Sequence, residues 1–413
     1  MNRIRNISPH WFVINLILIA WYFYVFSHLK TGISSEIMYS SSDAKSYMDV
    51  ANWMASGVDS PFVEHRPVLF PLILLFLSKL GGVFLIWFFQ FVLWIVSINL
   101  IFASIKRVTS NAVYGYIGVA IIGINLSLIT LTLHALTEIT SIFLLSVLLF
   151  FFLKNIERRK ELYFIHRIVL LFVLLTLIKP VFYLPLLFIL LLIVPGFYFK
   201  KYRKSPIKLL SLFLVLIPLL VQVGIMKVKY DSYSVSNISG RTFTNYLFAK
   251  GIQEIEGVER GESMDLSAGY EMEEKKDYFI KHIDVYNSIF WRNVEENIKG
   301  QSTFLVFPLG YEKPNLAKKM LTMNKVYFVL HIIFLPLSLF LFILLLRRKM
   351  KSEAMILTCL TGMYVYYIAV TGISFFQGDR LVLAAIPVWL VSYLFIVGCY
   401  VKFLLLKKEQ QTI

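Results

Sequence analysis

Ionisable side chains are scarce in this chain, and several stand at the ends of long apolar runs. Charged residues make up 16% of the 413 residues, whereas hydrophobic residues make up 58%. A carboxylate in such a place can act as a general base, and arginine or lysine can hold a phosphate. Ionisable groups at membrane depth are costly and usually face a cavity. The candidate site residues are Asp43, Tyr47, Glu64, His65, Arg66, Glu138, Lys179, Arg241, Asp379 and Arg380.

Asp43 lies in the segment SSDAKSYMDVANWMASG, which has the spacing of a short helix. Asp43, Tyr47 and Ala51 share one face of that helix, and Ser41 or Ser42 is suited to cap it. Asp43 is then a candidate general base at the start of the helix. Alternatively, it is only a first-turn acid that supports the helix dipole. The spacing leaves both interpretations open.

The segment Glu64-His65-Arg66 precedes a short apolar stretch. An arginine at such a junction can bind a phosphate or pair with a carboxylate, or it can simply anchor its loop. His65 alone predicts no metal site, and no spacing of His, Cys or Asp elsewhere suggests zinc. The two cysteines, Cys359 and Cys399, lie inside apolar runs and indicate no metal or disulfide motif. We therefore expect no metal ligands, although a divalent ion stays an open alternative.

The remaining candidates also have structural alternatives. Glu138 can hydrogen-bond a sugar hydroxyl or orient a base, or it is a first-turn acid of a helix. Lys179 lies in a tight turn between two apolar runs, where a lone cation indicates an anionic ligand. Arg380 either reaches a diphosphate or pairs with Asp379, and Arg241 is a further candidate for binding phosphate.

Apolar runs of about 17–25 residues, long enough to cross a bilayer, must position these groups. The sequence predicts an all-α polytopic membrane protein with about ten transmembrane helices. The predicted spans lie near 10–28, 83–104, 112–133, 139–156, 163–178, 180–199, 207–228, 324–346, 354–376 and 381–403.

Basic residues set the predicted orientation of these spans. Alternate connections hold 21 of the 41 Lys and Arg residues and four acids, at 3–5, 106–107, 154–167, 200–208, 347–353 and 402–409. These connections and both termini are therefore expected in the cytoplasm, and all candidate residues on the exoplasmic side. Residues 67–80 are too short to span, so we expect a re-entrant or interfacial helix within one exoplasmic loop, residues 29–82.

Residues 229–322 form a second predicted excursion. They hold 14 of the 25 acidic residues and 12 basic ones, whereas the chain as a whole has a net charge of +16. This contrast indicates a separate exoplasmic element. Apolar residues from Phe279 to Val294 recur at helical spacing and predict one amphipathic helix. The predicted division is a catalytic membrane module at 1–228, the excursion at 229–322 and C-terminal transmembrane helices at 323–413.

The positive charge is explained by these topology signals, and no basic patch has the aromatic interleaving that nucleic-acid binding needs. No nucleotide-binding motif is present in usable context. An activated donor is therefore most simply supplied by the membrane itself.

The first predicted exoplasmic loop (residues 29–82) resembles the corresponding loop of the membrane glycosyltransferases of the GT-C class. Within this class, the resemblance is nearest to the protein O-mannosyltransferases and the lipid A aminoarabinose transferases. The similarity rests on Asp43, Tyr47 and Ala51, followed by Arg66-Pro67 and Pro71, and is strongest over residues 10–200. Later marks are Glu138, Lys179-Pro180 and Arg380. The chain departs from relatives at Ala44, Lys179 and Leu381, where they often have Glu, Arg and Tyr.

The resemblance implies that Asp43 is the catalytic base and that Arg66, Lys179 and Arg380 hold a carrier phosphate. It implies transfer of a sugar from a polyprenyl-phosphate donor, usually with inversion, to an envelope glycan, lipid or protein at the outer face of a plasma (inner) membrane. No other cofactor and no nucleic acid is expected. Two alternatives remain: an O-antigen or capsule polymerase, which the acidic excursion disfavours, and a lipid-linked oligosaccharide flippase or transporter, disfavoured by spans nearly free of charge.

Overall fold

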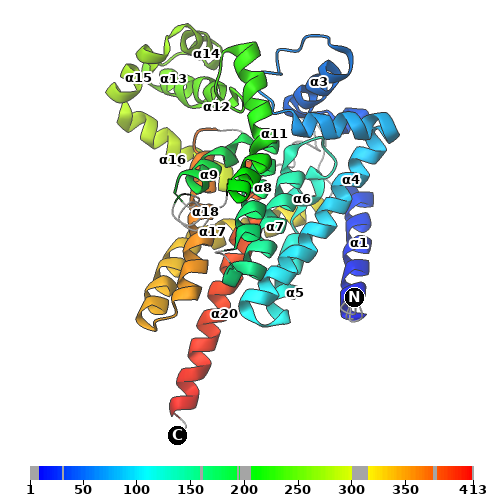
Figure 1. The fold of residues 1–413 in the computed structure, drawn as a ribbon, viewed down its shortest axis with the longest axis vertical. Helices are drawn as coiled ribbons and strands as arrows, with labels where there is room; N and C mark the ends of the chain where they lie inside the picture. Colours follow the sequence, from blue (N-terminus) through cyan, green and yellow to red (C-terminus); the bar gives the residue numbers. More distant parts are fainter. Residues whose placement is uncertain are drawn as a thin grey trace.

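The computed structural model describes residues 9–29, 32–158, 161–192, 195, 206–299, 315–374 and 379–411. Within these ranges the secondary structure is helical, without strands. Figure 1 shows a bundle of long helices. The start of α1 (Pro9–Leu29) and the end of α20 (Ile386–Gln411) lie at one end of the bundle, and α3 (Ser42–Ser56) and the short helices α12–α15 (between Ile238 and Lys281) lie at the other. The termini and the short helix that carries Asp43 are thus at opposite ends.

Seven of the described helices are long and apolar enough to cross a membrane. Three shorter apolar helices, within 112–123, 163–178 and 180–192, accompany them. Each of the ten predicted spans overlaps one of these helices, and the ends of the sixth and ninth spans lie outside the described residues. The seven are α1 (Pro9–Leu29), α4 (Leu69–Thr109), α7 (Thr137–Asn155), α11 (Pro206–Tyr230), α17 (Asn315–Arg347), α18 (Lys351–Thr371) and α20 (Ile386–Gln411).

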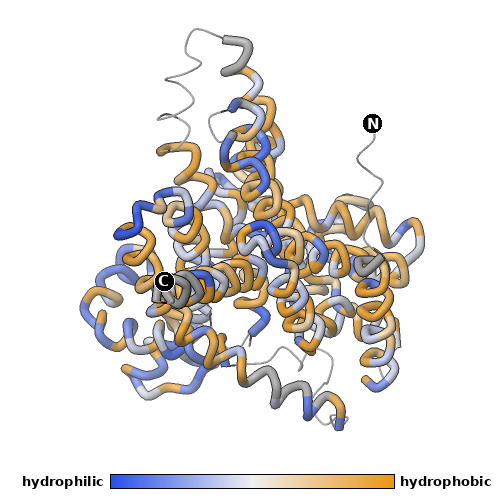
Figure 2. Tube along the Cα trace, turned by 90° about the horizontal axis from the view of Figure 1, so that it is seen from below, coloured by the Kyte–Doolittle hydropathy of each residue, from blue (hydrophilic) through white to orange (hydrophobic). Residues whose placement is uncertain are grey.

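A single buried cluster holds the bundle together. It extends from Leu18 on α1 to Phe403 on α20 and includes the fully buried Trp94 and Trp389. Helices from both halves of the chain therefore share one core. Figure 2 looks along the bundle and shows mainly hydrophobic residues in it, with hydrophilic ones gathered at one side.

Helix α4 changes direction at Gly81 and Gly82. Gly82 has φ 62° and ψ −151°, a conformation that is essentially restricted to glycine. The preceding part, Leu69–Leu80, runs across the top of the bundle in Figure 1. Its Leu72, Phe76 and Leu80 are exposed and recur every fourth residue, so this arm presents one apolar stripe outward.

The predicted span 112–133 is broken into α5 (Ala112–Gly123) and α6 (Leu126–Leu131). Asn125 caps α6 by accepting a hydrogen bond from the Leu128 amide (3.0 Å). The Gly123 carbonyl at the break accepts from Trp21 Nε1 (2.8 Å). These side chains replace backbone hydrogen bonds that the break removes, as an apolar environment requires.

A group of short helices, here called the helical cap (residues 238–299), covers one side of the upper end. The helical cap consists of α12 (Ile238–Thr242), a π-helical turn (Phe243–Phe248), α13 (Ala249–Glu256), α14 (Arg260–Gly269), α15 (Met272–Lys281) and α16 (Ile283–Lys299). Leu247, Phe248, Ile252, Tyr286 and Ile289 form its own small core.

The prediction of one amphipathic helix from Phe279 to Val294 is wrong in detail. His282 has φ −117° and ψ 32°, which ends α15 and starts α16 in a new direction. Ile283, expected on the apolar face, is half exposed, whereas Ile289 is fully buried. The helical period cannot continue across the break, so residues after it face differently.

Short elements complete the upper end of the bundle and its connections. They are α2 (Ser35–Met38), α3 (Ser42–Ser56), η1 (Ile156–Arg158), α8 (Leu162–Ile178), η2 (Pro180–Phe182), α9 (Tyr183–Phe188) and α19 (Arg380–Leu383).

Candidate functional site

Helix α3 begins with a side-chain cap that places Asp43 in its first turn. Ser41 Oγ accepts a hydrogen bond from the Ala44 amide (3.1 Å), as one of the two predicted caps. Tyr47 and Ala51 lie on the buried face of the helix, as their spacing predicts, and Asp49 is exposed. The Asp43 side chain is 26% exposed, so it lies at the boundary between the core and the surface.

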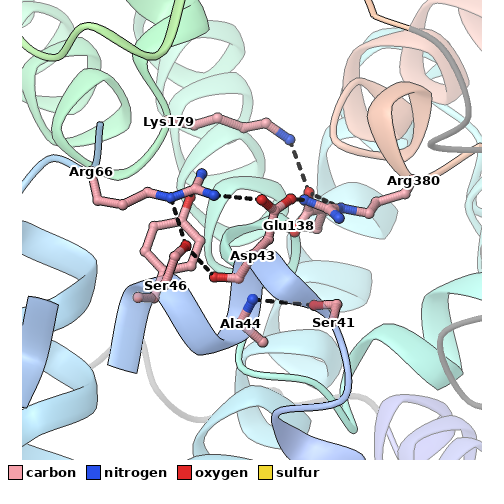
Figure 3. A network of polar contacts seen from close by, with 9 residues as sticks. Ser41, Asp43, Ala44, Ser46, Arg66, Glu138, Lys179 and Arg380 are labelled. Atoms are coloured by element: carbon pink, nitrogen blue, oxygen red, sulfur yellow. Dashed lines mark hydrogen bonds and ion pairs between the residues drawn. The ribbon is translucent and has the colours of Figure 1, made fainter. Parts of the chain in front are cut away.

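Asp43 binds two arginines that are far apart in the sequence. Its Oδ1 accepts from Arg66 Nη2, and its Oδ2 accepts from Arg380 Nη2 (Figure 3). Both guanidinium groups are largely buried, with side chains 12% and 9% exposed. Each oxygen of the carboxylate therefore has its own cationic donor.

Glu138 is the second acid of this group and is fully buried at the first turn of α7. Its Oε1 lies 2.9 Å from Arg380 Nε and 3.2 Å from Lys179 Nζ. Its other oxygen, Oε2, has no hydrogen-bond partner among the described residues. Arg380 thus bridges the two acids, as Figure 3 shows. We call Asp43, Arg66, Glu138, Lys179 and Arg380 the charge cluster.

Arg66 is held by two more side chains of α3. Its Nε donates to Ser46 Oγ (2.9 Å), and its Nη1 donates to the Tyr47 hydroxyl (3.4 Å). The guanidinium also lies over the Tyr47 ring, 4.5 Å from the centroid. Ser46 in turn donates to the Asp43 carbonyl (2.7 Å). Charge, hydrogen bonds and ring contact together fix the plane of this guanidinium.

The electrostatics favour an ionised Asp43. Burial by itself raises the pKa of its carboxyl, but the neighbouring Arg380 and Arg66 more than reverse this and hold the pKa well below its usual range. The charge cluster contains three cations and two carboxylates, so it keeps one excess positive charge. Such a site is suited to an anionic ligand that competes with the carboxylates for the cations.

Backbone contacts bring the distant segments of the site together. The Ala135 amide donates to the Met38 carbonyl (3.0 Å) and joins the start of α7 to α2. Gln222, buried on α11, accepts from the Val68 amide (3.1 Å) and donates to the Val235 carbonyl (2.9 Å). The loop that carries Arg66 is therefore fixed to α11.

Glu64 and His65 lie beside the charge cluster and make other contacts. Asn237 Nδ2 donates to Glu64 Oε1 (2.5 Å), and the Asn237 amide donates to the Glu64 carbonyl (2.9 Å). Burial, and then Arg241, lower the pKa of His65. Glu64 thus ties the first loop to the segment before the cap, which is a structural role.

Arg241 and Asp379 are the two remaining candidate residues. Arg241 is exposed on α12, close enough to His65 to affect its titration. The Asp379 carbonyl accepts from the Val382 and Leu383 amides (2.9 and 2.8 Å) and so starts α19. Its neighbour Arg380 pairs with Asp43 and Glu138. The sequence indicates Asp379 or a diphosphate as the partner of Arg380 and does not predict these two pairs.

Sequence reasoning missed Ser46, Gln222 and Asn237. Ser46 falls one turn after Asp43, and this spacing is a usable signal for a shared helix face. Gln222 and Asn237 act through contacts with segments more than 150 residues away. No local pattern predicts such pairings.

No group of three or more His, Cys, Asp or Glu side chains that could hold a metal ion occurs in the described part of the chain. The two acids of the charge cluster face cations instead. No family model, curated protein or solved structure matches this chain.

Proposed function

We propose that the protein is a membrane glycosyltransferase that moves a sugar from a polyprenyl-phosphate donor to an acceptor of the cell envelope. The supporting observation is the charge cluster, in which two acids, one near the surface and one buried, bind cations from three distant segments. These segments are the first loop, the turn after α8 and the start of α19. A donor phosphate bound by these cations would have its sugar positioned beside Asp43.

The proposal includes a topology with ten spans, in which the segments 112–133, 163–178 and 180–199 also cross the membrane and the Leu69–Leu80 arm lies in the outer interface. The exposed apolar stripe of the arm supports this placement. The termini are then cytoplasmic, and the charge cluster lies at the exoplasmic face of a plasma (inner) membrane. A lipid-linked donor presents its head group at that depth.

The reaction needs a base and a site for the leaving phosphate. The acceptor oxygen attacks the anomeric carbon, and its proton passes to the Asp43 carboxylate. The bond between the anomeric carbon and the phosphate oxygen breaks, and its electron pair stays on the phosphate, which gains a negative charge. Arg66, Lys179 and Arg380 stabilise that charge as it develops.

Asp43 must give up at least one arginine before it becomes an effective base, because Arg380 and Arg66 together hold the pKa of its carboxyl well below its usual range. The donor phosphate provides the exchange, since its oxygens accept the same guanidinium hydrogens. Donor binding then precedes acceptor activation. The proposal thus gives the resting ion pairs a role: they keep the cations in place until phosphate arrives.

The test is transfer from a synthetic polyprenyl-phosphate sugar to an envelope extract by the purified protein in nanodiscs. We expect Asp43→Asn to abolish transfer, because the amide cannot accept the proton, while the fold and lipid binding persist. Asp49→Asn is the matched control, since Asp49 is exposed on the same helix. Near-normal transfer by Asp43→Asn removes Asp43 from the mechanism. Absence of transfer by the unaltered protein with any such donor contradicts the function.

A further inference from the structure

The helical cap contacts the chain immediately before the segment that leads to Arg380. Helix α16 packs against α17, α18 and α19 and descends from the cap to the bundle in Figure 1. Its Asn293 and Asn297 are 3% and 1% exposed. Both side chains point to the end of α18.

The two asparagines bind backbone carbonyls at that end. Asn293 Nδ2 donates to the Gly372 carbonyl (3.0 Å). Asn297 Nδ2 donates to the carbonyls of Thr371 (3.0 Å) and Ser374 (2.7 Å). The last carbonyls of a helix have no partner within the helix, so these amides act as a cap supplied by another element.

Packing reinforces the hydrogen bonds. A Cβ atom at Gly372 would lie 2.6 Å from the ring of Phe290 on α16, so only glycine permits this approach. Ile373 packs against the small core of the cap. Residues 371–374 are therefore held in place by contacts with the cap as well as by their connection to α18.

Arg380 follows this segment closely in sequence and, among the described residues, is the one cation that contacts both acids of the charge cluster. Arg380 donates hydrogen bonds to Asp43 and Glu138, whereas the side-chain amides of the two asparagines donate to carbonyls of residues 371–374. The asparagines can affect the site through α19, which contacts both α16 and α7.

We propose that Asn293 and Asn297 are positioning residues for Arg380, through which the helical cap sets the affinity of the charge cluster for phosphate. The inference rests on the proposed function for the identity of the ligand. Its structural part, a coupling between α16 and Arg380, stands on the contacts alone. The cap is thereby part of the donor site, although the charge cluster contains no cap residue.

The experiment is a double-mutant cycle with Asn297→Ala and Glu138→Gln, which removes the carboxylate partner of Arg380. The first readout is thermal unfolding without ligand. If Asn297 acts through Arg380, the two losses of stability are not additive. Neutralising Glu138 already weakens the ion pairing of Arg380 that Asn297 supports. Additive losses overturn the proposal, since independent sites without shared partners add.

The second readout is the affinity for synthetic polyprenyl phosphate in nanodiscs. We expect Asn297→Ala to weaken binding about tenfold, which corresponds to about 1.4 kcal/mol, and to have no further effect in the Arg380→Gln background. The same tenfold loss in both backgrounds overturns the proposal. If the unaltered protein does not bind polyprenyl phosphate, the proposed function fails, and the unfolding cycle still decides the coupling.

Ser267→Ala is the matched control. Ser267 is fully buried in the cap and donates to the Thr244 carbonyl (2.8 Å), so its loss removes a similar hydrogen bond. It has no hydrogen bond to residues 371–374. We expect a comparable loss of stability without a change in phosphate affinity. A tenfold loss of affinity in this variant shows general loosening of the cap and contradicts a specific role for Asn297.

Discussion

Glu138 offers the strongest test of the charge cluster, because it is the fully buried acid between two cations. Its Oε1 lies 2.9 Å from Arg380 Nε and 3.2 Å from Lys179 Nζ. At an effective dielectric constant of about 20, a pair at such a distance interacts by about 5 kcal/mol before desolvation is subtracted. Removal of one partner of a buried pair typically costs about 3–5 kcal/mol.

The substitution Glu138→Gln keeps the shape and one acceptor oxygen but removes the charge. We therefore expect a loss near the lower end, about 3 kcal/mol, measured by unfolding of the purified protein in detergent. The excess positive charge of the cluster also rises, so phosphate should bind the variant more tightly. Saturating polyprenyl phosphate should then stabilise the variant more than the unaltered protein.

Glu157→Gln is the matched control, since Glu157 is exposed beyond the far end of α7 and the same chemical change should have little effect there. A Glu138→Gln variant as stable as the unaltered protein would refute a buried ion-paired cluster. Weaker stabilisation of that variant by polyprenyl phosphate would refute competition between Glu138 and phosphate for the same cations.

Three further outcomes are expected. Because Arg380 and Arg66 lower the pKa of Asp43, its carboxyl stays ionised until the pH falls below its ordinary value of about 3.9, so the acid limb of kcat/KM should lie below about pH 4. A limb between pH 5 and 6 that Asp43→Glu displaces would contradict this pairing. Gly82→Ala should cost about 1–3 kcal/mol in unfolding, because its backbone conformation is unfavourable for other residues, whereas Gly224→Ala, with open space and ordinary φ, should be nearly neutral. Ser41→Ala should cost about 1 kcal/mol through loss of the α3 cap and lower the transfer rate, and an unchanged melting temperature would show that the cap is unimportant.

Hydropathy and charge were sufficient to predict a helical membrane protein and the placing of its apolar segments. A helix that crosses lipid needs a long run of apolar residues, and such a run can be recognised from the local sequence alone. The break between α5 and α6 was not visible, because the residues that stabilise it, such as Trp21, come from other helices. Likewise, the change of direction at His282 depends on packing within the cap.

The candidate residues were chosen from their positions at the ends of spans, and five of them meet in the charge cluster. What the sequence could not supply is the pairing: Arg380 contacts Asp43 across 337 residues, and nothing local distinguishes it from a partner of Asp379. Glu64 and Arg241 had the same kind of position but make different contacts. The chemical type of a residue and its predicted side of the membrane therefore reduced the number of candidate site residues. Tertiary contacts determine which of these candidates form the charge cluster.

The most direct test is a cryo-EM structure of the protein saturated with polyprenyl phosphate. The account predicts the phosphate within hydrogen-bond distance of Arg66 and Arg380, with at least one oxygen of Asp43 released from its arginine. Lipid phosphate bound elsewhere, with both Asp43–arginine pairs intact, would contradict it.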